Sequence, residues 1–219
     1  MELTDNLLYI VRNGIFSSNS YILKDRLNDS CLLIDPGLDT QAIDNKLIEL
    51  NLKPMAILAT HGHFDHIGSV SFFKNKFKIP FYMHEADWKI SQSANFYLKI
   101  AKINHKIQTP KADKFFKEKI EKIIIGNFEL FIYNFQGHSA GSCIIQLNKF
   151  LFTGDIIYKK GLGFNNFPGE NKAKLKSSII EVFETFSEDS LVLPGHGESE
   201  YLINIKNNNQ DLINFLNFN

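Results

Sequence analysis

The sequence predicts an α/β fold in which helices cover β-sheets, and two observations support this prediction. Short apolar runs recur along the 219-residue chain, and segments with a helical spacing of apolar residues lie between them. Several of the runs end in histidine or aspartate next to glycine, which is typical of strands that deliver polar side chains to one edge of a sheet. Chains of this length often stay undivided, so we expect residues 1–219 to form a single domain.

The N-terminal half of the chain contains most of the predicted strands. Apolar runs predict strands at residues 7–11, 20–23, 31–34, 55–59 and 79–83. A helix is expected after the third strand, because Thr40 can cap it, the following apolar residues share one face, and Pro54 prevents its continuation. A second helix is expected over residues 70–77, which have a similar apolar spacing.

The C-terminal half continues this alternation. Residues 85–119 have a helical and basic pattern that Pro110 should break, and their aromatic residues are expected to pack in the core or to form part of a substrate wall. A hairpin with a two-residue Gly-Asn turn is expected at residues 123–131. The remaining expected elements are strands at residues 130–135, 150–155 and 191–193, a helix at 172–186, and a short closing helix at 207–219.

A dense cluster of potential metal ligands follows the predicted strand at residues 55–59. His61, His63, Asp65 and His66 occupy four of six consecutive positions. Side chains two residues apart can point the same way, while adjacent side chains diverge, so one metal could bind the first pair and a second metal the other. The alternative is a solvated loop that is rich in histidine for other reasons.

Three more residues strengthen the metal-site interpretation. His138 and His196 each follow a short apolar run and lie next to glycine, and Asp155 ends another run in the dipeptide Gly-Asp. The candidate set therefore contains five imidazoles and two carboxylates, with no thiolate. Nitrogen and oxygen donors of this kind suit zinc, iron or manganese, and the set alone does not choose among them.

The order and intervals of these residues resemble the metallo-β-lactamase superfamily, and within it the glyoxalase II (hydroxyacylglutathione hydrolase) branch and related short hydrolases. The resemblance runs from residues 19–21 to residues 194–197. It implies an αββα sandwich with two mixed β-sheets flanked by helices. It also implies one metal on His61, His63 and His138, a second on Asp65, His66 and His196, and Asp155 as the bridge.

The resemblance further implies a metal-dependent hydrolase that acts on a small molecule. Two divalent metal ions are expected, with zinc favoured and iron or manganese as alternatives, and a hydroxide that bridges them would be the nucleophile. A thiolate whose conjugate thiol has a pKa near 8.5 leaves without much acid assistance, so an acyl thioester is the expected substrate. Asp65 is expected to be catalytic as well as a ligand.

Two departures from the family pattern bear on the substrate. Glyoxalase II proper continues into a helical domain that contacts glutathione, whereas this chain ends 23 residues after His196. Family members also carry a basic residue after a Gly-x-Gly sequence, and here Phe164 stands at that position. Four nearby lysines could substitute for it: Lys159, Lys160, Lys172 and Lys174.

Three alternative functions remain open from the sequence. A persulfide dioxygenase would use a single iron on His61, His138 and Asp155. An ester or lactone hydrolase could use the same two metals. A metal-stabilised or redox module without catalytic activity is a third alternative, although such proteins normally join a flavin domain.

Composition and the remaining polar residues bear on the expected partners, the localisation and the residues that support the metal site. Lysine plus arginine and aspartate plus glutamate both total 24, so no nucleic-acid or membrane partner is expected. The N-terminus resembles no export signal and no apolar run could span a bilayer, so we expect a cytoplasmic protein with reduced, buried Cys31 and Cys143. Four further residues have expected supporting roles: Asp35 and Thr60 as hydrogen-bonding partners of the metal loop, His84 as a hydrogen-bonding residue near the site, and His105 as a solvated residue.

Overall fold

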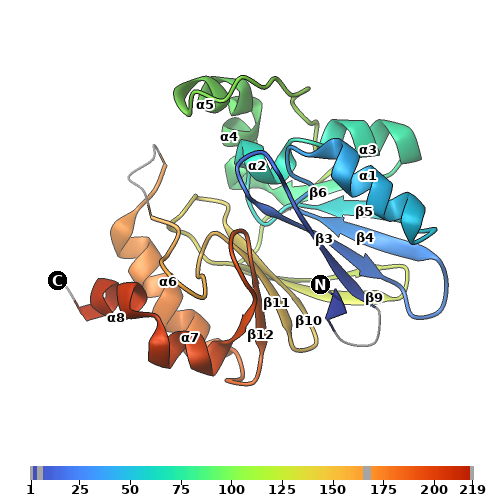
Figure 1. Cartoon of the computed structure of the whole chain (residues 1–219). Helices are drawn as coiled ribbons and strands as arrows, with labels where there is room; N and C mark the ends of the chain where they lie inside the picture. The colour runs from blue at the N-terminus through green and yellow to red at the C-terminus, as the bar shows by residue number, and fades with distance from the viewer. Residues whose placement is uncertain (1, 4–6, 165–168, 218–219) are drawn as a thin grey trace.

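The computed structural model describes residues 2–3, 7–164 and 169–217, and it consists of two mixed β-sheets packed face to face between helical layers (Figure 1). In the described residues the first sheet has seven strands in sequence order: β1 (Glu2–Leu3), β2 (Leu8–Arg12), β3 (Asn19–Lys24), β4 (Ser30–Ile34), β5 (Lys53–Leu58), β6 (Phe81–His84) and β7 (Lys114–Phe116). The second has six, in the order β13 (Glu200–Tyr201), β12 (Leu191–Pro194), β11 (Phe150–Gly154), β10 (Cys143–Leu147), β9 (Phe128–Asn134) and β8 (Ile120–Ile125).

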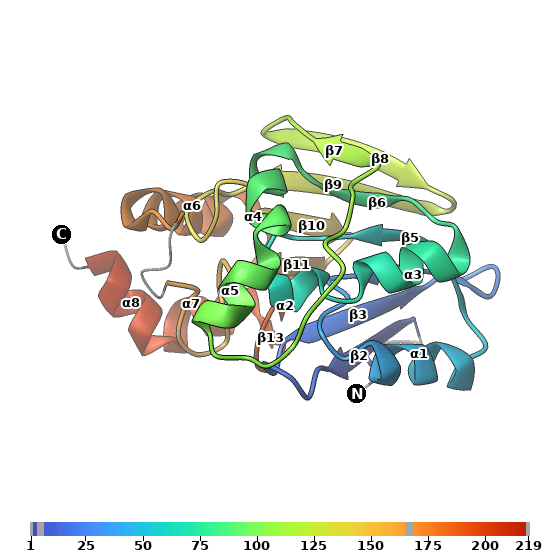
Figure 2. The same ribbon diagram turned by 90° about the horizontal axis from the view of Figure 1, so that it is seen from above.

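Helices cover the outer face of each sheet, as Figure 2 shows from above. The first sheet is covered by α1 (Thr40–Glu49), α2 (Phe64–Ile67) and α3 (Val70–Phe77), followed by a 3-10 turn at Glu85–Asp87 and the helices α4 (Trp88–Gln92) and α5 (Ala94–Ile100). The second is covered by α6 (Lys172–Thr185), α7 (Leu202–Asn208) and α8 (Gln210–Asn217). The predicted sandwich of two sheets flanked by helices is therefore confirmed.

The apolar runs in the sequence correspond to strands that are buried on both faces. In β4, Leu32 and Ile34 face the interior between the sheets, while Cys31 and Leu33 pack beneath the helices. In β11, Phe152 lies between the sheets and Leu151 packs under the C-terminal helices. Successive side chains of a strand point to opposite faces, so a strand covered on both sides must be apolar throughout.

Some local predictions hold and others need correction. The Gly126-Asn127 turn is confirmed, because Ile125 pairs with Phe128 across the hairpin. The cap of α1 is Asp39 and not Thr40, since the Asp39 side chain accepts a hydrogen bond from the amide of Ala42.

The helical prediction for residues 85–119 is wrong beyond residue 100. Residues 101–113 form no regular element, and residues 114–116 form the edge strand β7 instead of a helix, where Phe116 is buried between the sheets. The closing helix starts earlier than predicted, because α7 begins at Leu202 and Asn209 separates it from α8; residues 218–219 of the prediction lie outside the described residues.

The two cysteines lie in different layers, and both are buried and unpaired as expected. Burial raises the pKa of Cys31 to about 12 and that of Cys143 still further, so neither thiol forms thiolate at neutral pH. None of the helices in the described part of the chain is long and apolar enough to cross a membrane.

Candidate metal centre

The structure brings all seven predicted donors together, although they come from four distant parts of the chain. His61 follows β5 by three residues, and His63 directly precedes α2, which carries Asp65 and His66. The other three donors lie beyond the ends of β9, β11 and β12: His138, Asp155 and His196. Strand ends on the two sheets therefore meet at one edge of the sandwich, as the sequence pattern predicted.

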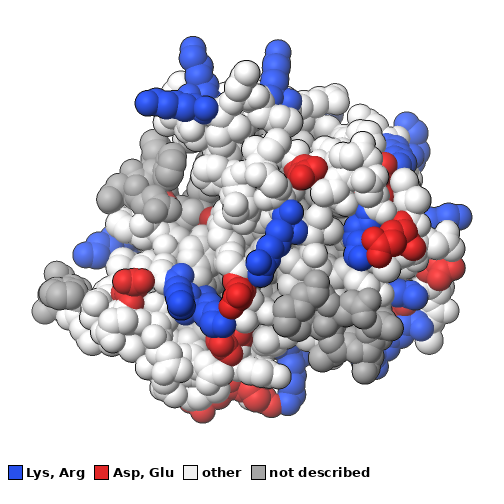
Figure 3. Space-filling model, viewed as in Figure 1, with Lys and Arg blue, Asp and Glu red and all other residues white. Residues whose placement is uncertain are grey.

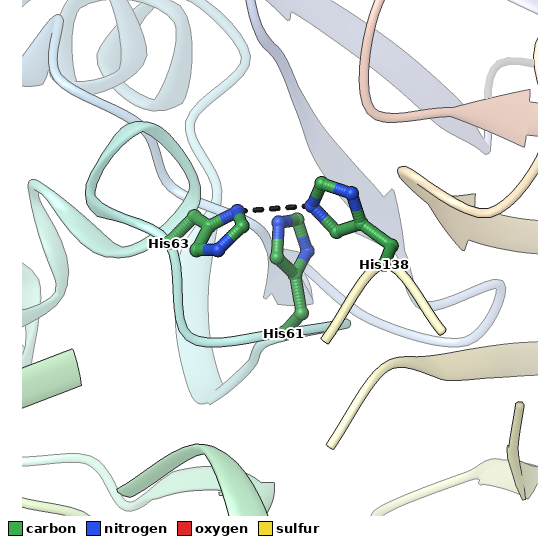
Figure 4. A group of neighbouring side chains, drawn as sticks. All are labelled: His61, His63 and His138. Atoms are coloured by element: carbon green, nitrogen blue, oxygen red, sulfur yellow. Dashed lines mark hydrogen bonds between the residues drawn. The ribbon is translucent and has the colours of Figure 1, made fainter. Parts of the chain in front are cut away.

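Three histidines form the first group. His61, His63 and His138 point toward one another, and one ring nitrogen from each lies within 4.8 Å of the others (Figure 4). The Nδ1 atom of His63 is 2.9 Å from Nε2 of His138. Three imidazoles that converge in this way offer a single cation three nitrogen donors, which is a frequent arrangement at catalytic zinc sites.

The second group consists of Asp65, His66 and His196. Oδ2 of Asp65 lies 3.3 Å from Nε2 of His66 and 3.1 Å from Nε2 of His196. All three donor atoms again fall within 4.8 Å of one another. This group is built differently from the first, because α2 supplies two of its donors and the end of β12 supplies the third.

Asp155 lies between the two groups and approaches both. Its Oδ1 is 3.5 Å from Nε2 of His66, and its Oδ2 is 3.6 Å from Nε2 of His138 and 3.5 Å from Nε2 of His196. One carboxylate thus contacts donors of each group with its two oxygens. This is the position that a ligand shared by two cations requires.

Unpartnered buried atoms test whether these residues suit a metal. The atoms His61 Nε2, His66 Nε2, Asp65 Oδ2 and Asp155 Oδ1 are buried and have no hydrogen-bond partner among the described residues. Buried polar atoms normally have a partner, and leaving one without costs about 1–3 kcal/mol. These four atoms belong to donors of both groups, so bound cations would supply the partners that the atoms lack.

Asp35 and Thr60 orient two of the imidazoles in the way predicted from the sequence. The Asp35 carboxylate accepts hydrogen bonds from the Thr60 amide (2.7 Å) and the Thr60 hydroxyl (2.6 Å), and it lies 3.1 Å from Nδ1 of His66. The Thr60 hydroxyl oxygen is 3.1 Å from Nδ1 of His61. When these Nδ1 atoms carry the protons, both Nε2 atoms face the centre as acceptors.

The ionisation of the cluster also favours cation binding. Burial and the neighbouring His138 lower the pKa of His63 to about 3, so this imidazole is neutral and keeps a free lone pair. Burial would raise the pKa of Asp155, but the adjacent imidazoles outweigh it and hold that pKa below its usual range. Burial opposes protonation of His196, yet Asp155 and Asp65 raise its pKa to about 9. A divalent cation would take the place of that proton.

Gly195 allows β12 to approach the centre closely. A Cβ atom at this position would lie 2.0 Å from Oδ1 of Asp155 and 2.6 Å from Cε1 of His66. We expect Gly195→Ala to displace Asp155 and to lower the number of metal ions bound per chain, measured by elemental analysis after dialysis. Gly14→Ala is the control, because this exposed glycine has room for a Cβ atom, whose nearest neighbour would be Oδ2 of Asp39 at 3.4 Å. Equal metal content in both variants would contradict this expectation.

Sequence reasoning missed Asp87, which joins the two loops that carry the first group of histidines. Asp87 is fully buried, and its carboxylate accepts hydrogen bonds from the amides of Gly62 (2.8 Å) and Gly141 (2.6 Å) and from the Ser139 hydroxyl (2.7 Å). Gly62 separates His61 from His63, and Ser139 follows His138, so Asp87 fixes the spacing of these histidines. Its position in a polar segment gave no signal, because only the fold brings the two loops to it.

Replacing Asp87 with asparagine should loosen both loops. An amide cannot accept all three hydrogen bonds with the strength of a carboxylate, and changes in groups that support metal ligands typically cost about 10–100-fold in metal affinity. We expect a loss of this size in a competition titration with a chromogenic chelator. Asp44→Asn, which removes a carboxylate that is bonded to Lys76 and lies in another part of the fold, should keep the wild-type affinity. An unchanged metal affinity for Asp87→Asn would show that the two loops keep their spacing without the Asp87 carboxylate.

Two other histidines lie outside the centre. His105 is exposed, as predicted. His84 forms a hydrogen bond as predicted, since its Nδ1 accepts from the amide of Ala86 (3.1 Å), but this partner belongs to the 3-10 turn after β6 and not to the donor groups.

A cavity of about 410 Å³ opens directly over the donors. Its walls combine donor side chains with aromatic and aliphatic residues, and the non-donor lining includes Phe16, Phe64, Tyr97, Tyr158, Lys160 and Leu162. Phe16 packs edge-on against Phe64, with ring centroids 5.2 Å apart. The cavity therefore has an apolar interior with the polar donors at its base.

Of the four lysines considered as substitutes for a basic residue at position 164, only Lys160 lines this cavity. Lys159 forms ion pairs with Glu198 (2.9 Å) and Glu200 (3.5 Å) instead. Lys174 donates a hydrogen bond to the side chain of Gln136, and Lys172 lies over the ring of Phe215. Phe164 itself packs against Phe215 and is not among the described residues that line the cavity.

Two mixed sheets between helical layers, with histidines and carboxylates gathered at one edge, define a class of enzymes that bind divalent metals. The chain belongs to the metallo-β-lactamase superfamily, whose family model matches residues 13–196. It is 33% identical to "Probable metallo-hydrolase YqgX" of Bacillus subtilis, over 92% of this chain and 95% of that protein. It is 26% identical to "Hydroxyacylglutathione hydrolase GloC" of Haemophilus influenzae, over 83% of this chain and 86% of that protein.

Solved structures give the same assignment. The BLEG-1 B3 metallo-beta-lactamase superposes with a TM-score of 0.85 and 29% identity, covering 94% of this chain and 99% of that one. TTHA1623 in a di-iron-bound form has a TM-score of 0.82 at 24% identity, with 92% and 98% covered. ETHE1 from Myxococcus xanthus has a TM-score of 0.74 at 20% identity, with 97% and 92% covered. The last two likenesses show the fold alone.

Proposed function

We propose that this protein hydrolyses an acyl thioester with two divalent metal ions, as hydroxyacylglutathione hydrolases do. The observation that supports this proposal is the pair of donor groups with Asp155 between them. His61, His63 and His138 would hold one ion, and Asp65, His66 and His196 would hold the other. The metal ions would supply a hydroxide nucleophile at neutral pH and polarise the thioester carbonyl.

The protein's own residues would position the reactants. The cavity would hold an acyl group against the apolar side chains of Phe16, Phe64 and Leu162, with its carbonyl toward the donors at the base. These side chains exclude water from the acyl chain, while Asp155 stays anionic between the groups. The thiolate would leave without a dedicated acid, because its conjugate thiol has a pKa of about 8.5. Asp65 would act both as a ligand and as part of the catalytic centre.

A mononuclear iron dioxygenase is the alternative, and the second donor group argues against it. Such an enzyme would use His61, His138 and Asp155 only. Asp65 and His66 would then keep buried atoms without hydrogen-bond partners, at a cost that a second cation removes. Zinc is our proposed ion, with iron or manganese as alternatives that the same donors accept.

A substrate panel tests the proposed function. Purified protein loaded separately with zinc, iron or manganese should release free thiol from acyl thioesters, detected with a thiol reagent, and should consume no oxygen with a persulfide. Thioester cleavage by a form with two ions per chain supports the hydrolase. Oxygen uptake with a persulfide by a form with one iron would support the dioxygenase instead, and cleavage of esters or lactones alone would exclude the thioester.

A further inference from the structure

An uninterrupted basic stretch lies beside the entrance to the cavity. We define the basic segment as residues 88–112, which include α4, α5 and the irregular chain after them. It contains five lysines and no aspartate or glutamate: Lys89, Lys99, Lys102, Lys106 and Lys111. In Figure 3 the upper edge of the molecule, where Figure 1 places α5, shows lysine or arginine side chains projecting without acidic ones among them.

The lysines of this segment differ from most others in the protein. Within the described part of the chain, no carboxylate lies within ion-pair distance of any of these five lysines. Nine other lysines do have such a carboxylate partner: Lys46, Lys74, Lys76, Lys117, Lys119, Lys122, Lys149, Lys159 and Lys206. The whole chain has a formal net charge of zero, so these five lysines give the basic segment a local excess of positive charge.

Helix α5 connects the basic segment to the cavity. Tyr97 lines the cavity, and its ring lies 6.4 Å from that of His63. On the same helix Phe96 is 62% exposed and Ile100 is 49% exposed, so a large apolar surface stands beside the lysines. Lys160 also lines the cavity and is the one lysine or arginine among the described lining residues. A molecule leaving the cavity past Tyr97 therefore meets both positive charge and an exposed aromatic ring.

The size of the cavity indicates that only part of a large thioester fits inside it. A volume of about 410 Å³ can hold an acyl group and the start of a thiol arm. A larger carrier must extend beyond the opening and lie on the surface there. Lysine side chains bind phosphate groups as point charges, and an exposed aromatic ring can stack on a nucleobase.

We propose that the substrate is an acyl thioester of a phosphate-bearing nucleotide thiol, of the coenzyme A class. The acyl group would lie in the cavity, the phosphates would contact Lys99, Lys102 and Lys160, and the base would stack on Phe96. This assignment rests on the proposed thioester hydrolysis and specifies its carrier. Glutathione fits less well, since it carries carboxylates but neither phosphates nor a flat ring.

The test compares one acyl group on three thiols: coenzyme A, glutathione and N-acetylcysteamine. Wild-type protein should have its highest kcat/KM with the coenzyme A thioester, and only this preference should fall as salt is raised from about 50 to about 300 mM. The variant Lys99→Gln/Lys102→Gln should lower the ratio of kcat/KM between the coenzyme A and N-acetylcysteamine thioesters about tenfold. Phe96→Ala should lower the same ratio. The control Lys46→Gln/Lys122→Gln, which removes two lysines from ion pairs elsewhere, should keep it.

Several outcomes would overturn this inference. A wild-type preference for the glutathione thioester would do so, as would an unchanged ratio in the double variant. Calorimetric titration with free coenzyme A measures binding of the carrier independently of thioester hydrolysis. Coenzyme A binding that weakens in the double variant, without hydrolysis of any thioester, would support the carrier site and contradict the proposed function. Hydrolysis of small thioesters without any coenzyme A binding would support the proposed function and contradict the carrier site.

Discussion

Replacing Asp155 with asparagine is expected to lower kcat/KM by about a thousandfold or more, which corresponds to ~4 kcal/mol of transition-state stabilisation. The amide keeps the shape of the side chain but loses the negative charge, and only one of its two polar atoms can accept a cation. Because the Asp155 carboxylate lies 3.5–3.6 Å from donors of both groups, the change affects both proposed metal positions at once. Activity on acyl thioesters and metal content of the same preparation should fall together.

A matched control separates this effect from misfolding. Asp189 is an exposed aspartate that contacts Lys149, so Asp189→Asn should keep activity and metal content at wild-type values. Circular dichroism of both variants should match the wild type, since Asp155 lies after a strand and makes no ladder hydrogen bond. Full activity in Asp155→Asn, with unchanged metal content, would rule out a bridging role for this carboxylate.

Removing the metal ions should lower the thermal stability of the protein strongly. Without cations, the buried donors keep their unpartnered atoms, and the carboxylates of Asp65 and Asp155 both lie within 3.5 Å of Nε2 of His196. An ion present at a thousand times its dissociation constant stabilises the folded state by about 4 kcal/mol, which for a chain of this size corresponds to a Tm shift of about 10 °C. Dialysis against a strong chelator should therefore lower Tm by about this amount and abolish hydrolysis.

Restoring the metal provides the control for chelation. Zinc, iron or manganese should recover both Tm and activity, whereas magnesium should not, because it prefers oxygen donors and the site offers five imidazoles. A chelated protein that keeps its Tm and its activity would contradict a functional metal centre.

The donor positions could be predicted from the sequence because they follow the apolar runs. Strands buried on both faces produce continuous apolar stretches, and the residue where such a stretch ends lies at a sheet edge. His61, Asp155 and His196 all lie at or just beyond the ends of such strands in the structure. The hydrogen-bonding roles of Asp35 and Thr60 could be predicted for the same reason, since both residues lie just after a strand end at that edge.

Contacts between distant segments could not be predicted in this way. Asp87 contacts the loops of His61 and His138 only because the 3-10 turn after β6 packs between them, and no local pattern encodes that packing. Among the candidate lysines, the choice of Lys160 depends on how the loop after Asp155 lies against α8. The strand β7 was hidden because three residues are too few for a periodic signal.

The metal content of the purified protein tests the central claim most directly. Elemental analysis of the protein, after dialysis against metal-free buffer, should give two divalent ions per chain for the wild type. The variants His63→Ala and His196→Ala, which each remove one donor from a different group, should each retain about one ion. A wild-type protein that binds no ion, or whose ion content is unaffected by both substitutions, would contradict the two-metal centre.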